Sequence, residues 1–231
     1  MRFPSPLIPG TLLRRYKRFF VDVKLESGRI VTAHCANSGS LLGCKAPGSA
    51  VLLSHQPAPG RMLKYTWEMI RVGRIWVGVN TMHPNRLVEE AIARGVIGEL
   101  QGYDLIRREV RISPRSRLDL CLERGGERCY VEVKNVTLGM DGVAAFPDAV
   151  TERGTKHLRE LIRLRRKGWR AALVFVIQRA DCATFRPADE IDPVYGRWLR
   201  RGTAAGVEVL PYLARVTPRE ITLRRRLPLL L

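Results

Sequence analysis

The sequence predicts a protein of the α/β class (α+β overall), in which a small β-barrel is followed by a mixed-sheet α/β domain. Short alternating strands separated by tight turns fill the first third of the chain, and strands mixed with helices follow from Pro84. The chain has 231 residues and is 45% hydrophobic, which is enough for two buried cores. We therefore expect a barrel domain over residues 1–82 and an α/β domain over residues 83–231.

Five short strands in the first domain indicate a small barrel of the oligonucleotide-binding (OB) kind. Two of the turns between them, at Ser27-Gly28 and at Gly73, are typical of hairpins. The predicted strands are Arg18–Glu26, Arg29–Cys35, Ser49–His55, Lys64–Val72 and Arg74–Val79.

The second domain is predicted to begin with a helix over Arg86–Arg94, capped by Asn85 and ended by Gly95. Apolar periodicity predicts two more helices, about Thr155–Lys167 and Val194–Ala205. The predicted strands are Leu105–Ile112, Arg117–Glu123, Arg128–Val136, Ala171–Ile177, Val207–Leu213 and Ile221–Leu227. This order of elements is typical of an α/β domain.

The charge balance indicates a polyanionic partner. There are 40 lysines and arginines against 22 acidic residues, for a formal net charge of +18. These basic residues are spread through the chain and do not form a tail, so we expect a folded surface that binds DNA, with RNA as the alternative. The sequence leaves the oligomeric state open, a homodimer included.

Two further features concern where the protein works. The segment after Met1 lacks an apolar stretch of signal-peptide length, and no segment approaches the roughly 18 apolar residues of a membrane span. The five cysteines form no C-x-x-C pair, and their odd number argues against a disulfide framework. We expect a soluble, cytoplasmic protein with no membrane partner.

The strongest chemical signal is a hairpin closed by Gly125-Gly126. A two-residue turn fixes the register, so that Asp119 is predicted to face Glu132. Leu118 and Leu120 would face Val133 and Val131 on the opposite, aliphatic side. Lys134 lies two residues after Glu132 and shares its face.

Two opposed carboxylates repel each other unless a cation lies between them. Mg²⁺ takes one or two protein carboxylates and accepts phosphate oxygens in its other positions, so Asp119 and Glu132 are predicted ligands of Mg²⁺ or Mn²⁺. With Lys134 as the catalytic amine, the three residues form a predicted catalytic set for hydrolysis of phosphodiesters. The alternative is a solvated hairpin face on which Lys134 neutralises Glu132.

A third acidic ligand is expected from the helix before the sheet. Glu89 and Glu90 are adjacent there, and both lie about 130° from the centre of the apolar stripe at 100° per residue. The pattern alone does not choose between them.

The helix after the hairpin carries a basic stripe that we expect to follow the phosphates of DNA. The alternative is an ordinary solvated face. His157 could instead be catalytic or a partner for a nearby carboxylate. The predicted DNA-binding residues are Arg153, Lys156, His157, Arg159, Arg163 and Arg166.

Several motifs, in the same order along the chain, resemble the sugar fermentation stimulation protein family (SfsA-like). The most specific is the run from Phe146 to Leu158. The others are Asn37-Ser38-Gly39, Asn85-Arg86-Leu87, Glu90-Ala91-Ile92, Ser116-Arg117-Leu118-Asp119 and Val131 to Leu138. The chain departs from the family pattern at Ala36, where Pro is common, and at Leu120, where Phe is common.

The resemblance implies an OB-like domain joined to a domain of the PD-(D/E)xK nuclease-like fold. It favours Glu90 as the helix-borne metal ligand, and it implies DNA binding with a link to the regulation of sugar metabolism. Two functions therefore compete. One is a Mg²⁺- or Mn²⁺-dependent nuclease, and the other is a non-catalytic DNA-binding regulator whose site is a relic or holds a structural metal.

Overall fold

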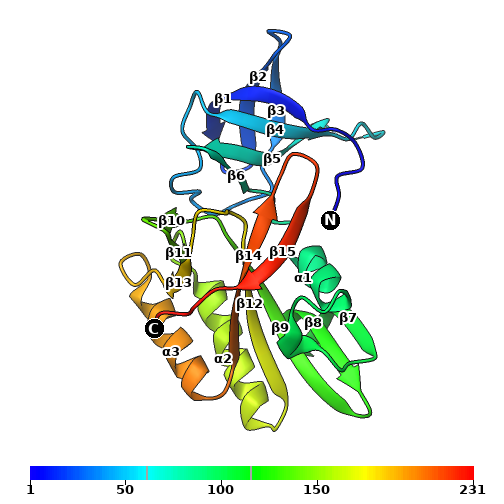
Figure 1. The fold of residues 1–231 in the computed structure, drawn as a ribbon, viewed down its shortest axis with the longest axis vertical. Helices are drawn as coiled ribbons and strands as arrows, with labels where there is room; N and C mark the ends of the chain where they lie inside the picture. The colour runs from blue at the N-terminus through cyan, green and yellow to red at the C-terminus, as the bar shows by residue number, and fades with distance from the viewer. Residues whose placement is uncertain (61, 115) are drawn as a thin grey trace.

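The first domain is a closed OB-like β-barrel, drawn in blue to cyan in Figure 1. The computed structural model describes residues 1–60, 62–114 and 116–231. The strand order is β3-β2-β1-β4-β5-β6, and a parallel β3–β5 pairing closes the barrel. The strands are β1 (Ile8–Tyr16), β2 (Phe20–Leu25), β3 (Ile30–His34), β4 (Ala50–His55), β5 (Tyr65–Val72) and β6 (Ile75–Gly78).

The second domain is built on a mixed six-stranded sheet in the order β15-β14-β12-β9-β8-β7. A small sheet, β10-β11-β13, lies beside it. The helices are α1 (Pro84–Ala93), α2 (Glu152–Arg166) and α3 (Pro193–Ala204), with a short 3-10 turn at Gly98–Leu100. The strands are β7 (Leu105–Ser113), β8 (Ser116–Arg124), β9 (Glu127–Val136), β10 (Gly139–Met140), β11 (Val143–Phe146), β12 (Arg170–Ile177), β13 (Thr184–Pro187), β14 (Glu208–Val216) and β15 (Ile221–Arg226).

This architecture confirms the predicted fold class of a barrel followed by a mixed-sheet α/β domain. Every predicted helix and strand is present, with ends that differ by at most three residues. Four strands were missed, namely β1, β10, β11 and β13. Pro9 hides β1, because proline is rare within strands, yet this strand pairs with both β2 and β4. The other three are only two to four residues long.

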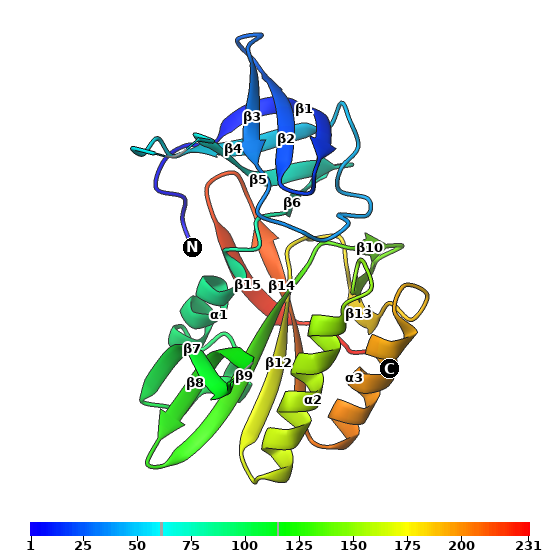
Figure 2. The same ribbon diagram turned by 180° about the vertical axis from the view of Figure 1, so that it is seen from behind.

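Helices cover both faces of the mixed sheet, and Figure 2 shows α1 on one side of it with α2 and α3 on the other. Alternation along the central strands feeds a separate core in each layer. Val174 and Val176 of β12 pack with α1, whereas Leu173 and Phe175 pack with α2 and α3. No helix in the described parts of the chain is long and apolar enough to cross a membrane. The five cysteines are free and buried.

The predicted cap of the first helix is wrong. The helix begins at Pro84, with His83 as the N-cap and no hydrogen bond from a capping side chain. Proline suits the first turn because its fixed φ matches the helix and its missing N–H is not needed there. Asn85 therefore lies inside α1, and its amide points toward the sheet. The helix ends as predicted, with Gly95 at a φ of +72°.

The N-terminal residue of the chain is bound to the second domain. The amino group of Met1 donates to the carbonyl oxygen of Ile221, and its side chain lies in the α1-side core. The barrel is in turn joined to the sheet through Gly78, whose N–H donates to the carbonyl of Gln178 at 2.9 Å. These contacts hold the two domains in a fixed relation around the site described next.

Candidate functional site

The Gly125-Gly126 hairpin folds in the register expected from the sequence. Both glycines have positive φ, at 54° and 90°, as a tight turn of this kind requires. The ladder pairs Leu120 with Val131 and continues to Arg124 and Glu127 at the turn. Local turn chemistry alone thus positions the two strands that carry the site.

At Asp119 the strands separate, and this departs from the predicted face-to-face pair. The Asp119 carboxylate replaces the ladder, because its Oδ2 accepts a hydrogen bond from the N–H of Val133 at 2.7 Å. The strand also changes its facing here. Leu120 packs in the α1-side core but Leu118 packs in the α2-side core, so the prediction of one continuous aliphatic face is wrong.

Glu132 of β9 is the most deeply buried of the site residues, at 2% exposed. Its Oε1 accepts a hydrogen bond from Nζ of Lys134 at 2.6 Å and also contacts Nδ1 of His157 on α2. An ionised carboxylate only accepts, so Nδ1 of His157 carries the proton in this contact. Its other oxygen, Oε2, is buried and has no hydrogen-bond partner among the described residues.

The two carboxylates at this site have opposite pKa shifts. Burial raises the pKa of Glu132, but the charge of Lys134 and the bond with His157 outweigh it and hold the pKa below its usual value. Burial raises the pKa of Asp119, and the charge of Glu132 raises it further. The hydrogen bonds of Asp119 with Val133 and Asn85 oppose this rise only partly. Burial and the neighbouring charge of Glu132 thus disfavour the ionised form of Asp119.

Asn85 is a site residue that the sequence analysis assigned to another role. Its Nδ2 donates to Oδ1 of Asp119 at 3.1 Å, so α1 helps to orient this carboxylate. Its place one residue after a proline gave no signal for this contact, which depends on how α1 rotates against the sheet.

The structure does not bring Glu90 to the site, contrary to the predicted metal set. Its carboxylate pairs with the Met1 amino group at 2.5 Å and with Arg86 at 2.9 Å. Glu89 is one helical turn after Asn85 and lies on the same side of α1, where it pairs with Arg108 of β7. The ion pair with Met1 thus engages Glu90, the glutamate that the resemblance favoured as a metal ligand.

The basic side chains predicted to form one stripe on α2 contact different neighbours. Arg159 lies over the ring of Trp198 on α3, and Arg163 pairs with Glu160 at 2.8 Å. Arg166 is exposed near the C-terminal end of the helix. Of the stripe, Lys156 stays beside the site, where it borders a cavity together with Asp119.

His157 was predicted to contact DNA, and this stays a prediction. Its side chain is only 6% exposed and is bound to Glu132, while the residue borders a cavity together with Asp119. The alternative considered for it, a partner for a nearby carboxylate, is the arrangement found.

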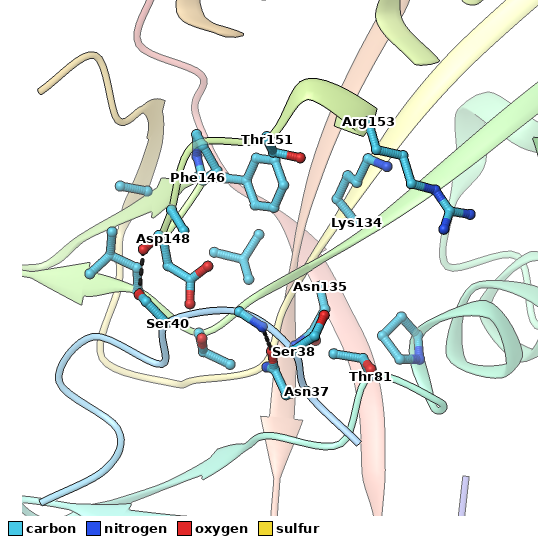
Figure 3. A pocket seen from close by; sticks show the side chains of 18 of the residues that line it. Asn37, Ser38, Ser40, Thr81, Lys134, Asn135, Phe146, Asp148, Thr151 and Arg153 are labelled. Carbon is cyan, nitrogen blue, oxygen red and sulfur yellow. Dashed lines mark hydrogen bonds between the residues drawn. The ribbon is translucent and has the colours of Figure 1, made fainter. Parts of the chain in front are cut away.

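A cleft of about 740 Å³ opens from the site toward the barrel. Lys134, Asn135 and Arg153 line it from the α/β domain, opposite the loop of Asn37 and Ser38 from the barrel (Figure 3). That loop and the segment from Phe146 to Thr151 were recognised only as sequence motifs, and neither was predicted to be part of the site. Only the docking of the barrel brings them together.

Two models of known protein families match the chain. A family model described as the sugar fermentation stimulation protein RE domain matches residues 82–220, and one described as the SfsA N-terminal OB domain matches residues 13–79. The chain belongs to the sugar fermentation stimulation protein family. The resemblance drawn from the sequence motifs is therefore confirmed.

Relatives within this family match along the whole chain. A sugar fermentation stimulation protein homolog from Geobacter sulfurreducens is 58% identical over 230 residues, covering 100% of this chain and 99% of its own. The homolog from Thioalkalivibrio sulfidiphilus is 55% identical over 227 residues, covering 97% and 96%. A solved structure, described as Pyrococcus furiosus SfsA in complex with Ca²⁺, is 30% identical with a TM-score of 0.91 and covers 100% of this chain and 98% of its own.

The bond between His157 and Glu132 predicts a clear stability effect in this member of the family. Replacing His157 with alanine removes one partner of a buried carboxylate and is expected to lower the free energy of unfolding by about 1–3 kcal/mol at pH 7. Because the folded pKa of Glu132 is depressed, its contribution is present above the ordinary glutamate pKa of about 4.3 and is lost as pH falls through the lower folded value.

Urea unfolding of the His157→Ala variant measures this loss. The matched control is Arg166→Ala, an exposed position on the same helix, where a change within about 0.5 kcal/mol is expected. Equal destabilisation by both substitutions would contradict a specific role for His157.

Proposed function

We propose that this protein is a divalent-metal-dependent phosphodiesterase that acts on DNA at the site of Asp119, Glu132 and Lys134. The observation that carries the proposal is the unpartnered, buried oxygen Oε2 of Glu132, in a site that also holds the carboxylate of Asp119, whose pKa is raised. An orphaned anionic oxygen in such a place costs stability unless a cation binds it.

The donor set suits a hard divalent cation. Asp119 and Glu132 would hold it, and Mg²⁺ or Mn²⁺ needs no more than one or two protein carboxylates when phosphate and water fill the other positions. The Ca²⁺ complex of the Pyrococcus furiosus relative supports a divalent ion. When bound, such an ion supplies Lewis-acid stabilisation of a phosphate and lowers the pKa of a water molecule.

The protein's own groups supply binding, orientation and charge. Lys134 lines the cleft, and its ammonium group would stabilise negative charge on a phosphate lying beside Glu132. Asn85 and the N–H of Val133 fix the direction of the Asp119 carboxylate, while His157 fixes that of Glu132. Arg153, exposed at the start of α2, lines the same cleft and is placed to bind a neighbouring phosphate.

A second candidate function is DNA binding without cleavage, in keeping with a regulator of sugar metabolism. One observation favours it. No group of three or more histidine, cysteine, aspartate or glutamate side chains in the described ranges could hold a metal ion. Glu90, the third predicted ligand, is engaged with Met1. A site with two carboxylates could then retain a metal for structure alone.

A cleavage assay separates the two candidates. We expect the purified protein to cut labelled DNA in Mg²⁺ or Mn²⁺ and to leave it intact in EDTA. Asp119 and Glu132 are both negatively charged, so they can bind a phosphate only through a metal ion. Single-stranded and double-stranded DNA, together with RNA of the same sequence, identify the substrate. Binding of DNA without cleavage in any of these ions favours the regulator.

A further inference from the structure

The barrel loop of residues 37–41 forms a roof over the cleft between the two domains, and hydrogen bonds hold this roof in place. The hydroxyl of Ser40 donates to the backbone carbonyl of Asp148, and the N–H of Leu41 donates to its Oδ2 at 2.8 Å (Figure 3). Gly39 packs directly on the same side chain, since a Cβ there would lie 2.8 Å from Oδ1 of Asp148. The barrel loop is thus joined to the α/β domain across the cleft.

A single arginine stiffens this roof from behind. The guanidinium of Arg15 donates to the carbonyl oxygens of Asn37 and Gly39, each at 2.8 Å, and to that of Ser40 at 3.4 Å. Three backbone carbonyls of the loop are therefore held by one side chain of β1. The roof has few ways to open without breaking these bonds and those to Asp148.

The size of the cleft selects among nucleic acids. Its volume of about 740 Å³ is within the range of about 300–1,000 Å³ typical of small-ligand pockets. A space of this size suits a few unpaired nucleotides, whereas a double helix is much bulkier than the ligands of such pockets. The bonds that hold the roof therefore favour a single strand over a duplex in this cleft.

A second cavity extends the cleft on the other side of the site. It has a volume of about 500 Å³ and lies between β7, β8 and the start of α2. Asp119 and Arg153 border both cavities, so the proposed catalytic site lies where the two meet. A strand lying in both cavities would place one phosphate at Asp119.

Exposed arginine and lysine side chains line both cavities. Arg111, Arg117 and Lys156 border the second cavity, and Arg18 and Lys45 border the interdomain cleft at its barrel side. Cations on both sides of the site suit a polyanionic strand better than a small ligand.

We infer that the interdomain cleft binds an unpaired nucleic-acid strand, which runs from the second cavity past Asp119 and under the loop of residues 37–41. This inference rests on the proposed function and names its substrate: a single strand, or the single-stranded end of a duplex. Arg18 and Lys45 bind phosphates of the segment that lies under the roof.

Binding in EDTA tests the inference apart from catalysis. Fluorescence anisotropy would compare one labelled oligonucleotide as single-stranded DNA, as blunt duplex, as duplex with an overhang, and as single-stranded RNA. We expect the single strand and the overhang to bind about tenfold to a hundredfold tighter than the blunt duplex, because the duplex must first be unpaired. The RNA arm shows whether the strand is DNA or RNA.

The double variant Arg18→Ala/Lys45→Ala places the strand in the cleft. For single strands, loss of two phosphate contacts is expected to reduce the slope of log affinity against log salt by about 1.4, at about 0.7 per phosphate. The blunt duplex should lose little. The charge-matched control is Arg224→Ala/Arg225→Ala on β15, at the sheet edge opposite β7, which should leave the strand preference unchanged.

The outcomes separate the inference from the proposed function. A blunt duplex that binds as tightly as the single strand overturns the inference, as does a cleft variant that weakens both equally. Cleavage in Mg²⁺ of the same oligonucleotides is scored separately. Single-strand binding in the cleft without cleavage would keep the inference and reject the phosphodiesterase.

Discussion

Replacing Lys134 with alanine is expected to lower the rate of metal-dependent DNA cleavage by about a hundredfold to a thousandfold. The ammonium group is only 2.6 Å from Glu132, and it lines the cleft where a phosphate would lie. Loss of one preorganised charge at the reacting group typically has an effect of this size. The measurement is the cleavage rate at saturating DNA in Mg²⁺ or Mn²⁺.

Conservative changes of the two carboxylates should have an effect at least as large. Asp119→Asn and Glu132→Gln keep the shape of each side chain but remove the charge that holds a cation. All three variants should still bind DNA in EDTA, which shows that they are folded. Lys167→Ala, an exposed lysine at the end of α2, is the matched control and should cut at the wild-type rate. Cleavage that survives in all three site variants would assign it to another site or to a contaminant.

Metal binding is expected to raise the melting temperature even if no substrate is found. An ion that binds only the folded state at about a hundred times its Kd contributes roughly 2.7 kcal/mol. For a chain of this length that corresponds to a rise of roughly 5–11 °C, at about 2–4 °C per kcal/mol. The ion would relieve the repulsion between Asp119 and Glu132 and would satisfy the buried Oε2 of Glu132.

The Asp119→Asn variant tests whether the charge of Asp119 lowers stability in the absence of metal. The folded pKa of Asp119 is raised, so ionisation of this group at neutral pH costs stability, and that cost develops as pH rises through its unfolded and folded values. The variant should therefore melt at or above the wild type in EDTA at pH 7 and lose most of the rise with Mn²⁺.

Thermal melts of both proteins, with and without Mn²⁺, make the measurement. Asp104→Asn, an exposed position just before β7, removes the same charge away from the site and should keep the full rise. A wild type without a metal-dependent shift, or an Asp119→Asn variant that keeps one, would exclude Asp119 as a ligand.

Local chemistry in the sequence was enough to place the two strands of the site. The positive φ values of Gly125 and Gly126 define a turn, and the turn defines every pair from Leu120 to Arg124. Side-chain alternation then puts Glu132 and Lys134 on one face of β9. The same reasoning failed one residue beyond the ladder, because the carboxylate of Asp119 competes with the backbone for the N–H of Val133.

Helical periodicity was too coarse to choose between Glu89 and Glu90. Adjacent residues on a helix are about 100° apart, and both lay at the same angle from the apolar stripe. The choice depends on how α1 rotates in its place against the sheet. The buried amino group of Met1 fixes that rotation from 89 residues away in the chain, by pairing with Glu90. No pattern within the helix records such a partner.

By itself, the sequence determined the class of each domain, most of the regular elements, the register of the Gly125-Gly126 hairpin from Leu120 to Arg124 and the excess of positive charge. These follow from interactions between residues close together in the chain. Only the tertiary structure decided that Asn85 orients Asp119, that His157 is buried against Glu132, and that Ser40 meets Asp148. The last contact joins residues 108 positions apart. Such contacts depend on how whole elements dock, and docking is set by the summed packing of both cores, which no local pattern contains.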